Sequence, residues 1–196
     1  MKNCEINRKL LHIFSGAAIP LAILFLPHFI TGIGLNIAVI VWGGMEILRS
    51  VSPSCQKIFK KLFGGFLRQE EDKKLTGTTW ILLASLICFF VFKKETATLV
   101  IALSIWGDAV AGVIGQKAGR IKIGSKTLEG SIACLSFCVL LLVFVFPWIF
   151  KIEFFISFII ITSLSVTILE FLSQFTPLDD NFIIPIVTGI IITLFF

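Results

Sequence analysis

Apolar segments of about 20 residues recur along the whole chain, separated by short polar stretches. Because a helix needs about 20 apolar residues to cross the hydrocarbon core of a bilayer, this pattern predicts transmembrane helices. We expect an all-α integral membrane protein, a bundle of about seven such helices that forms one polytopic domain over residues 1–196. The expected spans are residues 10–26, 32–48, 78–92, 97 into the central stretch, 131–150, 154–173 and 182–196. The third and seventh are close to the minimum length, so the count could differ by one.

The longest polar stretch, residues 50–76, interrupts this pattern. Apolar residues recur within it at helical spacing among lysines: Phe59, Leu62, Phe63, Phe66 and Leu67. Such a pattern predicts a cytoplasmic amphipathic helix that lies on the membrane surface. A plain solvated loop is the alternative.

The composition supports a membrane protein and excludes other classes. The chain is 57% hydrophobic and 15% charged, with a mean hydropathy of +1.00, whereas soluble domains average about 25% charged residues. The net charge of +5 could suggest nucleic acid, but the basic residues lie in short loops between apolar segments, so we expect no nucleic-acid partner. The five cysteines show no metal-binding spacing.

Lysine and arginine are divided unevenly between the two sides of the expected bundle. Fourteen of the 17 fall in the N-terminal segment, residues 49–75 and residues 116–126, which share one side. Because cytoplasmic loops carry an excess of Lys and Arg, this side and the N-terminus should be cytoplasmic. Seven spans then place the C-terminus outside. We expect a multi-pass protein of a bacterial or archaeal inner membrane.

The central stretch, residues 106–131, combines an intramembrane carboxylate with a basic, Gly-rich loop. A charge inside lipid costs a few kcal/mol, so Asp108 should face a polar cavity and have a function. Small residues recur here every four positions and predict a close helix–helix packing face: Gly107, Ala111, Gly115 and Gly119.

The loop over residues 116–130 is the expected phosphate-binding element on the cytoplasmic side. Glycines beside Arg120 and Lys126 at a helix start offer free backbone N–H groups and the positive end of the helix dipole, which suit phosphate. The segment from Gly119 to Thr127 nearly matches the nucleotide-binding P-loop. It has one residue too many before the lysine, and a membrane helix precedes it where a strand should be, so we reject that identification.

The other unusual polar residues fall at the same expected side of the membrane. They are Arg8, Lys9, His12, Glu46, Arg49, Glu129, Glu170, Asp179, Asp180 and Asn181. Arg8 and His12 could share a face toward a phosphate or act only as snorkelling anchors, and Glu46 and Arg49 could simply neutralise each other. The Asp179–Asn181 segment could be a helix N-cap. Its carboxylates, facing Asp108 and Glu129 across a cavity, would equally suit Mg²⁺, which needs hard oxygen ligands and bridges substrate phosphates.

At these residues the chain resembles the CTP-dependent lipid alcohol kinases, a family that includes dolichol kinase, phytol kinase and the yeast diacylglycerol kinase that uses CTP. The matching motifs are Arg8-Lys9-x-x-His12, Glu46-x-x-Arg49, Gly107-Asp108-x-x-Ala111-x-x-x-Gly115-x-x-x-Gly119-Arg120, Lys126-Thr127-x-Glu129-Gly130-Ser131 and Asp180-Asn181-x-x-x-Pro185. A similar block occurs in phosphatidate cytidylyltransferases, which end in a Lys-Arg and Lys-Asp signature. This chain has no basic residue after Lys151, which favours phosphoryl transfer over cytidylyl transfer.

The resemblance implies a membrane kinase that moves the γ-phosphoryl group of CTP to a lipid alcohol such as phytol, a farnesol-type prenol, a polyprenol or dolichol, or diacylglycerol. The implied metal ligands, for Mg²⁺ or another divalent cation, are Asp108, Glu129 and Asp180. The implied nucleotide-binding residues are Gly115, Gly119, Arg120, Lys126, Thr127, Gly130, Arg8 and Lys9. Asp108, Asp180 or His12 would orient the lipid hydroxyl, with possible support from Glu46, Arg49, Asp179 and Asn181.

Two other functions stay open from the sequence. One is a phosphatidate cytidylyltransferase, which makes CDP-diacylglycerol. The other is a small cation- or proton-coupled transporter in which Asp108, Glu129 and Glu170 form a relay. The absence of an inverted internal repeat argues against transport.

Overall fold

The computed structural model describes residues 16–64, 74–151 and 154–195, and nearly all of them are helical. Four helices among them are long and apolar enough to cross a membrane: α2 (His28–Val51), α5 (Lys94–Ala118), the continuous run Leu128–Phe150, and Ile156–Phe175. Three further apolar helices are shorter: Gly16–Phe25, α4 (Gly77–Val91) and α9 (Asp180–Phe195). The predicted all-α membrane class is therefore confirmed, and seven spans remain a prediction.

The run Leu128–Phe150 has three parts, α6 (Leu128–Leu140), a π-helical turn over Leu141–Val145, and α7 (Phe146–Phe150). Pro147 lies in the first turn of α7. Because proline has no backbone N–H to donate to the preceding turn, a wider turn at this junction has a local cause. The next span consists of α8 (Ile156–Leu172) and a 3₁₀ turn over Ser173–Phe175.

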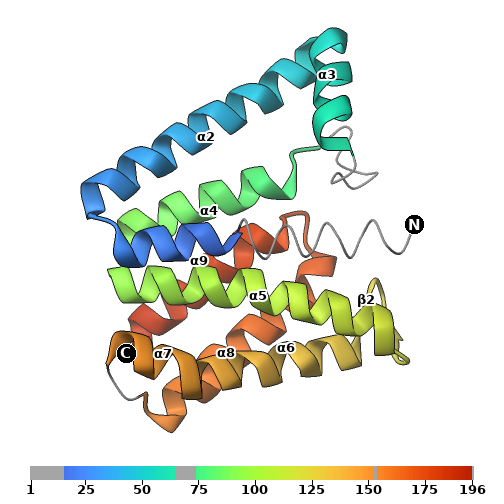
Figure 1. Ribbon diagram of the computed structural model, residues 1–196. Helices are drawn as coiled ribbons and strands as arrows, with labels where there is room; N and C mark the ends of the chain where they lie inside the picture. Colours follow the sequence, from blue (N-terminus) through green and yellow to red (C-terminus); the bar gives the residue numbers. More distant parts are fainter. Residues whose placement is uncertain (1–15, 65–73, 152–153, 196) are drawn as a thin grey trace.

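Helix α5 lies at the centre of the bundle, with α6, α8 and α9 packed around it (Figure 1). Of its apolar window 67% is buried, against 22% in α2. The small residues predicted to form a packing face do so against α6: a Cβ on Gly107 would lie 3.1 Å from the sulfur of Cys134, and one on Gly130 would lie 2.7 Å from the carbonyl oxygen of Ala111. Small residues thus bring the two backbones close together without a side chain between them.

Several helix ends differ from the sequence-based expectation. Helix α2 begins at His28, four residues before the expected Gly32, because Pro27 occupies the N-cap position and a glycine inside a membrane helix does not stop it. Helix α5 begins at Lys94, inside the expected turn, and continues to Ala118, inside the expected loop. Of the first expected span, residues 16–26 lie within the described part of the chain, and Gly16–Phe25 form a helix.

Two features between the spans complete the fold. Within the polar stretch 50–76, α3 (Pro53–Phe63) forms a separate helix that crosses the direction of the bundle (Figure 1). Between α5 and α6 the chain forms a short hairpin of β1 (Lys122–Ile123) and β2 (Lys126–Thr127), which pair antiparallel. The hairpin and α3 lie at the same end of the molecule (Figure 1).

Candidate functional site

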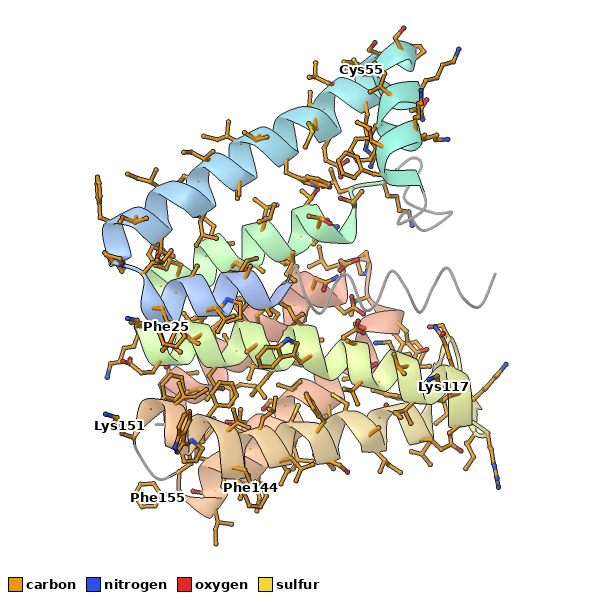
Figure 2. All side chains as sticks on the ribbon, in the orientation of Figure 1. Phe25, Cys55, Lys117, Phe144, Lys151 and Phe155 are labelled. Carbon is orange, nitrogen blue, oxygen red and sulfur yellow. The ribbon has the colours of Figure 1, made fainter. Side chains whose placement is uncertain are left out.

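Four helix ends and the hairpin meet at one end of the bundle. The C-terminal ends of α5 and α8 and the N-terminal ends of α6 and α9 all lie on the side of the hairpin, whereas the turns after α4 and α7 lie on the opposite side (Figure 1). Figure 2 marks the two ends, with Lys117 beside the hairpin and Lys151 at the opposite end. The polar residues near these helix ends are therefore brought into one region, although they come from separate parts of the sequence.

Lys126 is the centre of this region. Its Nζ donates hydrogen bonds to Oε1 of Glu170 at 2.7 Å and to the backbone oxygen of Glu170, and lies 3.5 Å from Oδ2 of Asp180. The side chains of Lys126 and Glu170 are 17% and 4% exposed. Ser131 donates from Oγ to the second oxygen of Glu170 at 3.3 Å. The lysine is thus held between two carboxylates in a site that excludes most water.

Asp108 belongs to the same group of charges. It lies half-buried on α5, and its carboxylate interacts electrostatically with Lys126 and with Glu170. Burial lowers the pKa of Lys126, but the three carboxylates more than offset this effect, so the net result is a raised pKa and a lysine that stays charged at neutral pH. The group contains three carboxylates and one ammonium.

The hairpin that carries Lys126 is held in place at both ends. Gly124 has a φ of +64°, in the left-handed region that glycine adopts without strain. Beside it, Gln174 from the 3₁₀ turn after α8 accepts hydrogen bonds from the backbone N–H of Ser125 at 2.8 Å and from its hydroxyl at 3.2 Å. Thr127 caps α6 by accepting from the N–H of Gly130. The backbone around Lys126 is therefore fixed by short-range contacts to α6 and α8.

The predicted glycines surround Thr127. A Cβ on Gly115 would lie 2.6 Å from the Thr127 hydroxyl oxygen, and one on Gly119 would lie 2.6 Å from its methyl group. Gly130 is the residue that Thr127 caps. These positions need glycine because α5, the hairpin and α6 meet there at short distance. Arg120 lies exposed on the outside of the same hairpin.

The predicted metal set requires Glu129 to lie close to Asp108 and Asp180, but the structure does not bring it there. Its carboxylate accepts from the backbone N–H of Ile121, at 3.1 and 3.3 Å, and so holds the entrance of the hairpin. Within the described residues, no group of three or more His, Cys, Asp or Glu side chains is close enough to hold a metal ion. Asp108 and Asp180 each interact with Lys126. Magnesium in phosphoryl-transfer sites commonly uses one or two protein carboxylates together with substrate phosphates.

At the start of α9, the three adjacent polar residues have different positions. Asp179 accepts from the backbone N–H of Asn181 at 3.0 Å and from its side-chain amide at 2.6 Å, so it acts as the N-cap that was one of the two alternatives. Asn181 is 5% exposed. Asp180 is the residue of the three that reaches Lys126.

Glu46 and Arg49 form a second, buried group whose partners lie elsewhere. Arg49 donates from Nε to Glu46 at 2.7 Å, so the two do neutralise each other. Glu46 also accepts from the backbone N–H of Thr76 at 3.0 Å and from the hydroxyls of Thr76 and Thr79 at 2.6 and 3.0 Å. Arg49 donates to the backbone oxygen of Lys74. This group therefore ties α2 to the start of α4.

Sequence patterns missed some of these partners. Glu170 was singled out only as a possible relay carboxylate, and Ser131, Gln174, Thr76 and Thr79 were given no role of their own. A carboxylate in an apolar helix was the available signal for Glu170. Arg8, Lys9 and His12 lie outside the described residues.

Comparisons with known proteins point to lipid phosphorylation. No protein-family model matches the chain, and no solved structure matches it. It is 25% identical over 144 residues to the CTP-dependent diacylglycerol kinase 1 of Saccharomyces cerevisiae, covering 67% of this chain and 47% of that one. It is 27% identical over 153 residues to the kinase of the same name from Schizosaccharomyces pombe, covering 70% and 66%. An uncharacterized protein of Rickettsia prowazekii is 24% identical over 186 residues, covering 93% of this chain and 90% of that one. The chain thus spans about half the length of the S. cerevisiae kinase.

Proposed function

We propose that this protein is a membrane-embedded lipid kinase that transfers the γ-phosphoryl group of CTP to the hydroxyl of a lipid alcohol, with diacylglycerol as the first acceptor to test. The observation that carries the proposal is Lys126, half-buried and held by Glu170 and Asp180 near Asp108 at one end of an apolar helical bundle. The distant similarity to CTP-dependent diacylglycerol kinases supports the choice of nucleotide and acceptor.

The charges of the site suit a metal-bound nucleotide. Three carboxylates around one lysine would repel a free nucleoside triphosphate. Asp108 and Asp180 would hold Mg²⁺, which supplies neutralisation of the phosphate charge when it is bound. Lys126 would exchange part of its contact with Glu170 for a phosphate oxygen. The exposed Lys117, Arg120 and Lys122 around the hairpin would attract the same anion.

In the proposed reaction the lipid hydroxyl oxygen attacks the γ-phosphorus of CTP. A new O–P bond forms, the bond from the γ-phosphorus to the β,γ-bridging oxygen breaks, and CDP leaves. The hydroxyl proton passes to a carboxylate, for which Asp108 and Asp180 are the candidates. Phosphoryl transfer depends mostly on positioning and charge neutralisation, so a small constellation on helix ends is sufficient.

The seam between α2 and α4 offers a path for an acyl chain. One groove of about 380 Å³ lies between these helices and is lined by residues such as Phe29, Ile33 and Phe89. A second cavity of about 180 Å³ lies between the same helices and extends to Glu46 and Thr79, and Gly43 also lines it. A lipid tail that stays in this apolar seam avoids the cost of transfer into water, about 0.8 kcal/mol for each CH₂ group.

The test uses purified protein in detergent or nanodiscs with Mg²⁺ and CTP labelled at either the α or the γ position. Diacylglycerol, phytol, farnesol and undecaprenol serve as acceptors, and unlabelled ATP as a competitor measures nucleotide preference. We expect label from γ-³²P-CTP in diacylglycerol, lost by at least about 100-fold in Asp108→Asn. Glu95→Gln is the matched control, because Glu95 is an exposed carboxylate near the opposite end of the same helix.

Two outcomes would contradict the proposal, and a third would change only its acceptor. Label from α-³²P-CTP in lipid when phosphatidate is supplied would establish a cytidylyltransferase. Labelling of phytol or a polyprenol in place of diacylglycerol would keep the kinase and change its acceptor. If neither α-³²P-CTP nor γ-³²P-CTP labelled any lipid, lipid phosphorylation would be refuted and transport would be the function to examine.

A further inference from the structure

Helix α3 is oriented differently from the long apolar helices of the described chain. It runs across the bundle direction, at the end that also carries the hairpin, so its axis lies along the expected plane of the membrane surface (Figure 1). It contains 11 residues, which is too short to cross a bilayer. Ser52 accepts from the N–H of Cys55 and Pro53 occupies its first turn, so its start is well defined.

One side of α3 is fixed to the protein. Phe59 is 5% exposed, and the rings of Phe59 and Phe63 lie 6.0 and 5.3 Å from the ring of Trp42 on α2. The guanidinium of Arg49 lies over the Phe59 ring at 4.9 Å. These contacts determine which sides of α3 face away from the bundle.

The outward sides carry both apolar and basic residues. Ile58 and Leu62 are one helical turn apart and are 59% and 64% exposed. Lys57 and Lys61, also one turn apart, are exposed beside them, and no acidic residue lies within α3. Exposed aliphatic side chains are common one at a time, but a contiguous exposed apolar strip beside basic residues marks a contact with a membrane or a partner.

The apolar strip continues onto the membrane-spanning surface. At the end of α2, next to α3, Ile47 and Val51 are 65% and 72% exposed. Because α2 is long and apolar enough to span a bilayer, these exposed residues would face lipid at the level where α3 begins. Ile58 and Leu62 extend that lipid-facing surface sideways, and the lysines beside them lie at the level of the headgroups.

We propose that α3 is a docking surface for anionic lipid headgroups, with Ile58 and Leu62 inserted at the acyl boundary and Lys57 and Lys61 bound to the headgroup phosphates. The partner is the negatively charged membrane surface and not a protein, because the exposed residues of α3 combine apolar side chains suited to shallow insertion with lysines and no acidic residue within the helix. Each lysine near such a surface strengthens the attachment roughly fivefold. The inference is independent of the proposed kinase activity.

The test places an environment-sensitive fluorophore on Ile58→Cys in the full chain, in a background of Cys4→Ser and Cys55→Ser. Cys88, Cys134 and Cys138 are buried, so they stay unlabelled in the folded protein. The protein is reconstituted in nanodiscs of neutral phosphatidylcholine or of the same lipid with phosphatidylglycerol. Quenching by acrylamide, a neutral quencher, reports the exposure of position 58 to water.

We expect acrylamide quenching to be at least about twofold weaker in the anionic discs, and the difference to disappear in Lys57→Gln/Lys61→Gln or at high salt. Lys93→Gln/Lys94→Gln removes the same charge at the opposite end of the bundle and should keep the difference. Hydrogen exchange of α3 in the protein without the probe is the second measurement, and it should be slower in anionic discs. Equal quenching and equal exchange in both discs, or the same loss in the Lys93/Lys94 control, would overturn the proposal.

Discussion

The ion pair between Lys126 and Glu170 allows the structural and chemical roles of one lysine to be separated. The perturbations are Lys126→Met, Glu170→Gln and the double variant. Loss of Lys126 leaves Glu170, 4% exposed, without its cation and next to two other carboxylates. Breaking a buried pair from one side costs about 3 kcal/mol or more, because an uncompensated charge remains.

The two single variants should differ in how much stability they lose. In Glu170→Gln the lysine keeps Asp180, whose Oδ2 lies 3.5 Å away, and it keeps the backbone oxygen of residue 170. We therefore expect a loss of about 1 kcal/mol for Glu170→Gln, near the value of one hydrogen bond. The double variant removes both charges and should recover most of the stability lost in Lys126→Met.

The assay has two readouts on the same samples. Thermal unfolding in detergent measures stability, and about 3 kcal/mol corresponds to a Tm shift of roughly 6–12 °C for a chain of this size. CTP binding in the presence of Mg²⁺ measures the proposed phosphate contact. We expect CTP binding to be lost in both variants that lack Lys126 and kept in Glu170→Gln. The exposed Lys122 on the same hairpin provides the control Lys122→Met, with little change in Tm.

Two results would refute this reasoning. If Lys126→Met and Glu170→Gln had the same Tm, the inference that losing the lysine costs more stability than losing the Glu170 charge would be wrong. If the double variant recovered CTP binding together with stability, the role of Lys126 would be structural and the proposed phosphate contact would be wrong.

Three further predictions concern the surroundings of the site. Gly43 and Gly44 both have open space where a Cβ would lie, but of the two only Gly43 lines the cavity between α2 and α4. Gly43→Leu should therefore raise KM for the lipid acceptor several-fold and leave CTP affinity unchanged, whereas Gly44→Leu should not raise that KM. Glu46→Gln should cost about 2 kcal/mol in thermal unfolding with a much smaller effect on kcat, because its buried oxygens accept hydrogen bonds from Thr76 and Thr79, and neither of these partners belongs to the lysine cluster. Gln174→Ala should speed hydrogen exchange in the hairpin and raise KM for CTP about tenfold, whereas Gln116→Ala, at an exposed position, should do neither.

Each of these predictions has a result that would contradict it. Equal effects of the two glycine substitutions on KM for the lipid would show that the seam between α2 and α4 is not the path of the acceptor. A loss of kcat in Glu46→Gln at unchanged stability would make that group part of the chemistry. Unchanged hairpin exchange in Gln174→Ala would show that other contacts hold the loop.

Some of the fold follows from local properties of the sequence. The apolar runs placed the membrane helices, since hydrophobicity and segment length are read within a single stretch of chain. The four-residue spacing of Gly107, Ala111 and Gly115 likewise predicted the packing face on α5. Helix ends were less predictable, because the local sequence allows a helix to begin just after Pro27 or at Gly32.

In the candidate site, the sequence by itself identified Asp108 as a carboxylate that an apolar segment makes costly, Lys126 as a cation of a Gly-rich loop, and Asp180 as a carboxylate at a helix start. It did not identify their partners. Glu170 reaches Lys126 from 44 positions away, and Thr76 reaches Glu46 from 30 positions away. Such contacts depend on which helices are neighbours.

The direction of a side chain was decided only by the tertiary structure. Glu129 was expected to join Asp108 and Asp180 as a metal ligand, yet its carboxylate turns to the backbone N–H of Ile121, where the hairpin leaves a donor to be satisfied. Asp179 and Asp180 are adjacent in sequence, but one caps α9 and the other reaches Lys126. Composition and periodicity determine which segments enter the membrane and which charges are costly there. Packing determines which charges meet, because the energy of a buried charge depends on the specific atoms around it.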